Sequence, residues 1–441
     1  MNFQKEDFLR KKIFELVKKF SKIKYQKIPF RPGIDDVPVS GKVIGEKELV
    51  NMVDASLDGW LTTGRFNENF EKRIAEFVGA KYAMTVNSGS SANLVAFSCL
   101  TSSRLKERQI KKGDEVITVA AGFPTTVNPI LQNGAIPVFV DIDLDTLNIK
   151  AENIEKAITP KTKAIMLAHT LGNPFNLDLI KDLCLKYNLW LIEDCCDALG
   201  STYNNKMVGT FGDIATLSFY PAHHITMGEG GAVLINNGSL KLIAESFRDW
   251  GRDCFCKPGK DNTCRRRFCW TKKQLGGQLP DGYDHKYIYS HKGYNLKITD
   301  MQASCALAQL ESLSDFIDAR KKNYTYLHQK LKKYSNFFYF HNATNGSDPS
   351  WFGFPITLKK NSKIDRFQLI NYLNDNKIGT RLLFAGNLTK QPYMKNENFR
   401  VYQDLKNTDY VMNNTFWIGV FPGIKKIHLD YIVKSFEKIL G

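Results

Sequence analysis

The feature that most constrains the fold is an alternation of short apolar runs with longer helical stretches. Buried strands of a parallel sheet read as continuous apolar runs, and their crossover connections are usually helices. The alternation therefore predicts an α/β protein with a mostly parallel sheet and helices on both of its faces. The apolar runs are 82–86, 115–119, 137–140, 163–168, 189–192 and 232–235, and the first helical stretches are 46–57, 67–77 and 90–100.

The regular pattern stops over roughly residues 252–292, which hold Gly, Pro, four Cys and three consecutive Arg. Irregular segments this long in a compact protein are usually functional or disordered. Helical spacing returns over 299–334. A strand at 352–358 and helices at 364–373 and 429–440 then predict a smaller second lobe. We expect an N-terminal extension (1–45), a large domain with an inserted loop (46–300), and a linking helix with a small domain (301–441).

Composition and the absence of certain motifs argue against several classes of function. No run approaches the eighteen or so apolar residues of a membrane span, and residues 1–27 lack the apolar core of a signal peptide. We expect a cytoplasmic protein with no membrane contact, whose first residues form an amphipathic surface helix. The formal charge of +16 permits acidic partners, but zinc-finger, homeodomain and RNP signatures are missing from the sequence, so we expect no nucleic acid. Nine Cys without a secretory signal predict reduced thiols or metal ligands.

The segment SFYPAHHITMGEGG at 218–231 resembles the Schiff-base lysine loop of the DegT/DnrJ/StrS-type sugar aminotransferases. His223 stands where that family carries its lysine, while His224 falls one position later and is expected to be structural. Imidazole cannot form an imine, but its pKa near 6.5 lets it move protons. The exchange indicates deoxygenation rather than amino transfer.

The resemblance extends from about residue 62 to the C-terminus. It implies an aspartate aminotransferase-like fold (fold type I of the pyridoxal phosphate enzymes), with a large sheet lobe and a small C-terminal lobe. It also implies a homodimer that acts on nucleotide-linked keto sugars.

Several cofactor-binding residues follow from the same resemblance. Asp194, after a buried apolar run, would face the pyridine nitrogen and keep the ring an electron sink. Gly89 and Ser90 lie in a strand–helix turn of small residues, where helix N-terminal amides favour a phosphate, and Ser218 would be a third contact. Phe123 would stack on the ring.

Asn295 lies in GYNLKITDMQA at 293–303, which resembles the family segment that crosses the dimer interface. By that resemblance, Asn295 would reach the cofactor phosphate of the partner subunit. Lys297 stands where the family often has arginine.

Four cysteines suggest a metal site: Cys196, then Cys254, Cys256 and Cys264 close together. Four thiolates can hold zinc or an iron–sulfur cluster, and spacing alone does not choose between them. The spacing resembles that of the family's iron–sulfur 3-dehydratases, which act on CDP-4-keto-6-deoxyglucose and also carry histidine for lysine. That likeness implies a [2Fe–2S] cluster beside pyridoxamine 5′-phosphate. The other possible ligands are Cys195 and Cys269.

These features predict an enzyme, a lyase that removes the C3 hydroxyl of CDP-4-keto-6-deoxyglucose in 3,6-dideoxyhexose synthesis for lipopolysaccharide O-antigen. A separate NAD(P)H-dependent flavin or iron–sulfur reductase would supply electrons, because the chain lacks a Gly-x-Gly-x-x-Gly fingerprint. Three alternatives remain open: a cluster-free 3-dehydratase of GDP-4-keto-6-deoxymannose, a nucleotide-sugar aminotransferase, and a non-catalytic nucleic-acid-binding or regulatory protein.

Overall fold

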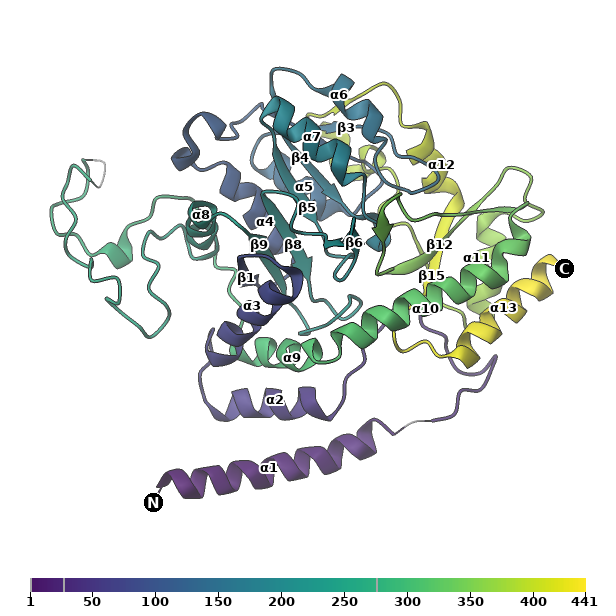
Figure 1. Ribbon diagram of the computed structural model, residues 1–441, viewed down its shortest axis with the longest axis horizontal. Coiled ribbons are helices and arrows are strands. Elements are labelled where there is room, and N and C mark those ends of the chain that lie inside the picture. Colours follow the sequence, from purple (N-terminus) through teal and green to yellow (C-terminus); the bar gives the residue numbers. More distant parts are fainter. Residues whose placement is uncertain (1, 27, 275–276) are drawn as a thin grey trace.

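The computed structural model describes residues 2–26, 28–274 and 277–441. Residues 1, 27 and 275–276, which fall within the predicted extension and insert, lie outside the described residues. Figure 1 shows a large central sheet flanked by helices, and a smaller sheet towards the C-terminus.

In the described chain the large sheet has eight strands in the order β1-β9-β8-β5-β4-β2-β3-β14. From β8 to β14 every neighbouring pair is parallel, whereas β9 runs antiparallel to both β1 and β8. The prediction of a mostly parallel sheet is therefore confirmed. The strands are β1 (Tyr82–Val86), β2 (Glu115–Thr118), β3 (Ile136–Phe139), β4 (Thr162–Ala168), β5 (Trp190–Asp194), β8 (Ile214–Ser218), β9 (Gly231–Ile235) and β14 (Arg400–Val401).

Helices cover both faces because successive strand residues enter different cores. Leu191 packs in one core and Ile192 in the other, the period of two expected of a strand. One face is covered by α4 (Gly89–Leu100), α5 (Pro124–Gln132) and α8 (Gly238–Arg248). The other is covered by α3 (Arg65–Val78), α6 (Ile154–Ala157), α7 (Leu177–Tyr187) and α9 (Asp300–Leu310).

The smaller lobe is built on an antiparallel sheet in the order β10-β12-β15-β13. Its strands are β10 (Phe338–Phe340), β12 (Gly353–Leu358), β13 (Thr380–Leu382) and β15 (Thr415–Gly419). Its helices are α10 (Leu313–Leu331), α11 (Arg366–Asp375), α12 (Lys406–Asn414) and α13 (Lys426–Leu440). A third small sheet joins β11 (Ser347–Asp348), β6 (Thr202–Tyr203) and β7 (Lys206–Met207). The division at residue 301 stays a prediction; β14 follows it in sequence yet pairs with β3 in the large sheet.

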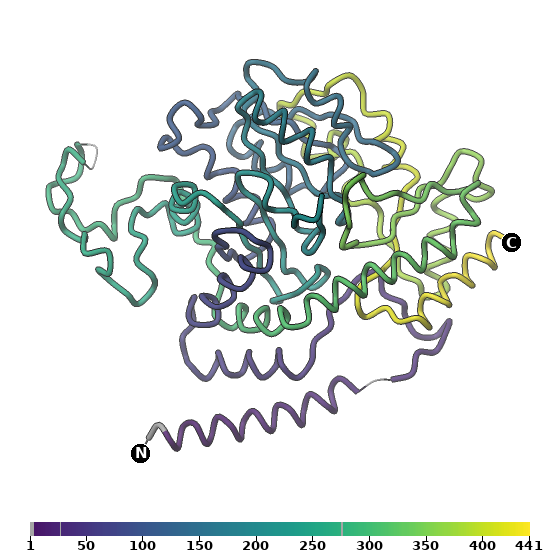
Figure 2. Tube along the Cα trace, in the orientation of Figure 1, coloured from purple at the N-terminus to yellow at the C-terminus, as the bar shows by residue number. Residues whose placement is uncertain are grey.

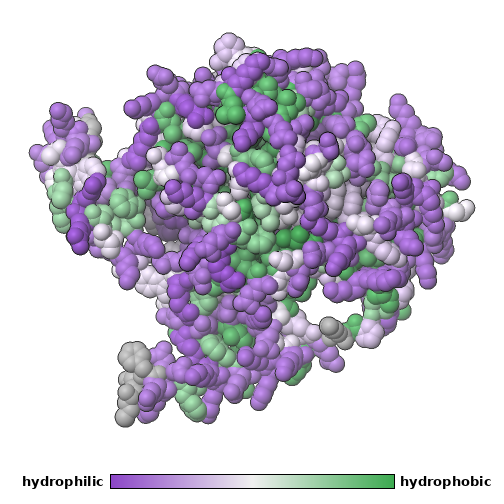
Figure 3. All heavy atoms as spheres, viewed as in Figure 1, coloured by the Kyte–Doolittle hydropathy of each residue, from purple (hydrophilic) through white to green (hydrophobic). Residues whose placement is uncertain are grey.

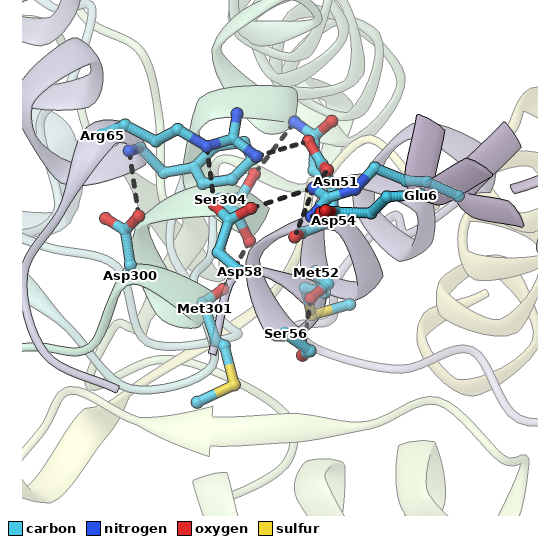
Figure 4. A network of polar contacts seen from close by, with 12 residues as sticks. Glu6, Asn51, Met52, Asp54, Ser56, Asp58, Arg65, Asp300, Met301 and Ser304 are labelled. Atoms are coloured by element: carbon cyan, nitrogen blue, oxygen red, sulfur yellow. Dashed lines mark hydrogen bonds and ion pairs between the residues drawn. The ribbon is translucent and has the colours of Figure 1, made fainter. Parts of the chain in front are cut away.

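The first helix, α1 (Asn2–Lys24), lies along α2 (Glu46–Leu57), as Figure 1 shows. Arg10 of α1 forms ion pairs with Asp54 and Asp58. Arg65 joins the same two carboxylates, with Nη2 2.8 Å from Asp54 Oδ2 and Nε 2.7 Å from Asp58 Oδ2 (Figure 4). Most of α1 is exposed, so it is a surface helix as predicted. Its amphipathic character stays a prediction, because large apolar side chains such as Leu16 and Ile23 are among the exposed ones. Among the described residues, every helix is too short or too polar to cross a bilayer.

The insert between α8 and α9 forms an irregular projection from the large domain (Figure 2). Its two ends are joined by backbone bridges between Asp249 and Asn295 and between Arg252 and Tyr289. The irregularity predicted for 252–292 is therefore present, and its base is a short two-stranded stem.

Candidate functional site

Asp194 is the last residue of β5 and is held by three donors. Its Oδ2 accepts from Asn93 Nδ2 at 2.8 Å and from Thr126 Oγ1 at 2.7 Å, and its Oδ1 accepts from the Cys196 amide at 3.1 Å. The carboxylate is 5% exposed and lies at the carboxyl edge of the parallel strands, where open α/β sheets bind ligands. This arrangement gives a fixed anionic group of the kind that pairs with a protonated ring nitrogen.

Three predicted residues converge beside it at the N-terminus of α4. A Cβ on Gly89 would lie 2.5 Å from Ser218 Cβ, 2.8 Å from Ser218 Oγ and 3.1 Å from Cys196 Sγ. Only glycine, which has no Cβ, fits at position 89 without a shift of Ser218. Ser88 caps the helix by accepting from the Ser91 amide at 3.0 Å, and Ser90 is exposed at the first turn. A small-residue turn with free helix amides is a suitable cradle for a phosphate.

Phe123 and Asn295 both present side chains to solvent. Phe123 is 51% exposed and packs edge-on against Phe384, with ring centroids 5.9 Å apart. Its free face is available for stacking. Asn295 is exposed. It lies beside the phosphate cradle, because the amide of Asn87, just after β1, donates to the carbonyl of the next residue, Leu296, at 2.8 Å. Lys297 is partly buried, 3.4 Å from Asp249 Oδ1 and over the Trp250 ring.

His223 lies in the loop after β8, with its Nδ1 3.4 Å from Asp197 Oδ1. Its ring is 5.1 Å from the Phe352 ring, at 33°. Burial raises the pKa of Asp197, and the contact with His223 offsets part of that rise. Asp197 beside Nδ1 orients the imidazole and leaves Nε2 for proton transfer.

The buried side chain of Arg320, in α10, holds the loop of His223 in place. It is fully buried and donates to the carbonyls of Ala222 and His223 and, across the lobe boundary, to those of Trp351 and Phe352. Burial lowers the pKa of Arg320 to about 9, and the Asp197 carboxylate opposes this.

His224, in contrast to His223, is a structural residue. It is 2% exposed and its Nε2 donates to the Ser350 carbonyl at 2.8 Å. Burial lowers the pKa of His224 well below its usual value, so this ring is neutral.

The inserted loop brings three of the four predicted metal ligands together. The Cys264 amide donates to Cys256 Sγ at 3.4 Å, and the Cys254 thiol contacts that of Cys256. Burial raises the pKa of Cys256, but hydrogen bonds from Thr263 and Cys264 outweigh it and lower this pKa to about 7. A thiol with so low a pKa is a ready metal ligand.

Cys196 is not part of that group in the described chain. Its charged and thiol neighbours are Asp194, Asp197 and Cys195, and burial followed by Asp194 raises its pKa well above the usual value. The structure thus places Cys196 at the phosphate cradle and the other three cysteines on the projecting loop. Of the two other cysteines that the sequence offered as possible ligands, Cys195 is buried and Cys269 is exposed on the loop.

A buried trio at His169, Glu193 and Cys195 has ligand atoms within 4.8 Å of one another, closer than the loop thiols lie among the described residues. Its hydrogen bonds are already made within the protein. Glu193 accepts from His169 Nε2 and from the amides of Gly209, Phe211 and Gly212. This trio fastens the 206–212 loop to β5, and its polar atoms are satisfied without a metal.

A large cleft of about 1290 Å³ separates the inserted loop from the body of its own chain. It lies between α3, α8 and the loop, and its lining includes Trp60, Arg248, Cys254 and Cys256. The loop therefore leaves an open cleft against its own domain, although it contacts that domain through Lys257 and Gly259.

Four residues that hold the predicted ones in place were not predicted from the sequence. Asn93 and Thr126 orient Asp194, and Asp197 and Arg320 orient the loop of His223. Asp197 could have been predicted from the sequence, because it follows Asp194 by three residues at the carboxyl end of a strand. The remaining three lie far from their partners in sequence, and no local motif marks them.

Residues 43–437 match the DegT/DnrJ/EryC1/StrS aminotransferase family. The lipopolysaccharide biosynthesis protein RfbH of Salmonella typhimurium is 62% identical over 433 residues, which cover 98% of each chain. The dTDP-4-dehydro-2,6-dideoxy-D-glucose 3-dehydratase of Saccharopolyspora spinosa is 50% identical over 93% of this chain and 88% of its own.

Among solved structures, the E. coli GDP-4-keto-6-deoxy-D-mannose-3-dehydratase with bound hydrated PLP has a TM-score of 0.80 and 31% identity. The match covers 90% of this chain and 98% of that one. The aspartate aminotransferase-like fold, with its site for a pyridoxal phosphate-type cofactor, is confirmed.

Proposed function

The chain belongs to the DegT/DnrJ/EryC1/StrS aminotransferase family, and we propose that it is a pyridoxamine phosphate-dependent 3-dehydratase of CDP-4-keto-6-deoxyglucose. The observation that carries this proposal is the position of His223, which the resemblance aligns with the family lysine, with its Nδ1 3.4 Å from Asp197 Oδ1. The relative at 50% identity, a dideoxysugar 3-dehydratase, supports the same reaction class. The relative at 62% identity, a lipopolysaccharide biosynthesis protein, supports the pathway.

The described residues fit the cofactor. The crowded Gly89 turn, with Ser90 and Ser218, would hold its phosphate, Asp194 its ring nitrogen and Phe123 its ring face. When bound, pyridoxamine phosphate supplies an amine for the sugar ketone and a conjugated ring that accepts electrons. Position 223 lacks a primary amine, so the cofactor would be held by these non-covalent contacts.

His223 would act as the proton carrier of the site. With Asp197 against Nδ1, the Nε2 atom is free to take a proton and return it, which favours loss of the C3 hydroxyl as water. Arg320 keeps the loop in place by binding its carbonyl oxygens. General acid–base catalysis by one such group typically contributes about 10² to 10⁴-fold.

Net deoxygenation requires two electrons and two protons in addition to the loss of water. The thiols of Cys254, Cys256 and Cys264, with Cys196, are a donor set of the kind that holds a [2Fe–2S] cluster. Such a cluster would pass electrons singly from a separate NAD(P)H-dependent flavin or iron–sulfur reductase. Arg265 and Arg266 on the same loop would favour an acidic donor.

The experiment is anaerobic purification followed by iron, sulfide and cofactor analysis, with turnover of CDP-4-keto-6-deoxyglucose in the presence of a reductase. The expected product is the CDP-linked 3,6-dideoxy-4-keto sugar. The GDP-mannose and dTDP-glucose analogues serve as controls for the nucleotide and the sugar. Formation of a 4-amino sugar, or full turnover by iron-free protein, would refute the proposal.

A further inference from the structure

We infer that the iron–sulfur site is built across the dimer, with Cys196 from one subunit and Cys254, Cys256 and Cys264 from its partner. This inference rests on the proposed function, which supplies the cluster and the homodimer. It adds which chain gives each ligand.

The first observation is the separation of the four thiols within one chain. Cys254, Cys256 and Cys264 neighbour one another on the loop, whereas Cys196 Sγ lies at the phosphate cradle, against the position that a Gly89 Cβ would take. A fourth ligand for the loop thiols must therefore come from elsewhere or from a large movement of the loop.

The second observation is that the loop is anchored to its own chain on the side of α3. Asp253 pairs with Arg104, and Lys257 Nζ lies 2.9 Å from Glu68 Oε1. Gly259 packs on Trp60, where a Cβ would lie 2.8 Å from the indole ring. Bringing the loop thiols to Cys196 of the same chain would break these contacts, because Cys196 lies outside the cleft that the loop borders.

The third observation is where the stem of the loop lies. Asn295, whose segment resembles the interface segment of the family, is bridged to Asp249 at the base of the stem. Cys254 follows Asp249 by five residues, a reach of at most about 17 Å. Asn295 also lies beside the phosphate cradle of its own chain, so this reach is compatible with the Cys196 of either subunit. The contacts that hold the loop against α3, away from its own Cys196, favour the partner's Cys196.

The surfaces involved are suited to cover one another. The loop region exposes large aromatic side chains, with Phe255 at 55%, Phe268 at 61% and Tyr289 at 51%. Tyr220, in the loop that carries His223, is 51% exposed as well. In Figure 3 the projection on the left mixes green and pale atoms with hydrophilic ones. Clusters of exposed aromatics are typical of interface cores, and a second copy of this chain carries both surfaces.

The test is a mixed dimer. One chain carries Cys196→Ser and the other Cys254→Ser with Cys256→Ser, each with its own affinity tag, and the doubly tagged dimer is isolated anaerobically. If the site is shared, one complete set of ligands remains per dimer, so iron, sulfide and the cluster's electron-spin signal should be about half of the wild-type values. If all four ligands come from one chain, both sets are incomplete and the mixed dimer should hold none.

Each parent homodimer should hold no cluster while still binding pyridoxal phosphate; a parent that keeps its iron overturns the ligand assignment. Cys269→Ser, an exposed thiol on the same loop, is the matched control and should keep full iron. Alanine variants replace the serine variants if those fail to assemble. A wild-type dimer without iron refutes the cluster in the proposed function, whereas an iron-loaded wild type with an iron-free mixed dimer refutes only the sharing.

Discussion

Asp197 Oδ1 lies 3.4 Å from Nδ1 of His223, the residue that the sequence predicts at the position of the family lysine. The pair joins the end of β5 to the loop after β8, and the carboxylate is three residues beyond Asp194. A lysine at position 223 would bind the cofactor covalently, whereas an imidazole braced by a carboxylate can only move protons. We therefore expect the pair to serve dehydration rather than amino transfer.

Asp197→Asn should lower the rate of C3 hydroxyl exchange by about 10 to 10³-fold while leaving cofactor binding unchanged. The amide cannot stabilise a positive imidazole, so the lower limb of the pH–rate profile should also move. A pH profile identical to that of the wild type would show that Asp197 does not act through His223.

His223→Lys should form a covalent link with pyridoxal phosphate that borohydride traps at residue 223, and it should lose dehydration. His223→Asn should bind the cofactor without the link and should also lose proton exchange. Peptide mass spectrometry locates the trapped adduct, and its absence from residue 223 would refute the register on which the site is built.

Arg320→Met should lower the free energy of unfolding by about 2 to 4 kcal/mol, because four buried carbonyls lose a charged donor. Arg320→Lys should recover only part of this loss, since an ammonium cannot reproduce the planar fork. Denaturant titration measures both, and a fully stable lysine variant would contradict the geometry.

Gly89→Ala should reduce pyridoxal phosphate affinity, because its Cβ would overlap Ser218 at 2.5 Å. Gly238→Ala, at the first turn of α8, is the matched control, since its nearest neighbour would be Tyr82 Oη at 3.8 Å. Absorbance titration with the cofactor compares them, and equal affinities would place the phosphate elsewhere.

Stability should fall as the pH drops below about 6.5, with a contribution from His341. Burial lowers the pKa of His341 to about 4, so the unfolded chain takes up a proton that the folded one refuses. Stability is thus complete above the unfolded pKa and declines down to about pH 4, by up to about 3 kcal/mol for this residue. His341→Gln should flatten the decline, as unfolding at pH 7 and pH 5 would reveal.

The parts of the fold that follow from local pattern could be predicted from the sequence. The helix over Glu46–Leu57 and the strand over Tyr82–Val86 were placed to the residue, because their periodicities are strong. The helical stretch over 299–334 proved to be two helices, α9 and α10, separated at Glu311 and Ser312. Helical spacing continues across that break, so the pattern alone did not reveal it.

The site shows the same limit. His223 and Asp194 could be proposed as site residues because they lie in motifs that can be read along the chain. Arg320 was not, because its four partners are carbonyls whose positions depend on tertiary packing. The spacing of the cysteines indicated a common ligand set, but only the structure shows that Cys196 lies apart from the loop thiols of its own chain.

Oxygen exchange at C3 tests whether the chain removes the C3 hydroxyl through His223. Wild type and His223→Asn are incubated with pyridoxamine phosphate and CDP-4-keto-6-deoxyglucose in oxygen-18 water, without a reductase. Label at C3 is read from the isotope shift of the carbon-13 signal, because the C4 ketone exchanges oxygen by itself. We predict label at C3 with the wild type and none with His223→Asn. An unlabelled C3 with the wild type, or conversion of the sugar to its 4-amino derivative, would contradict the account.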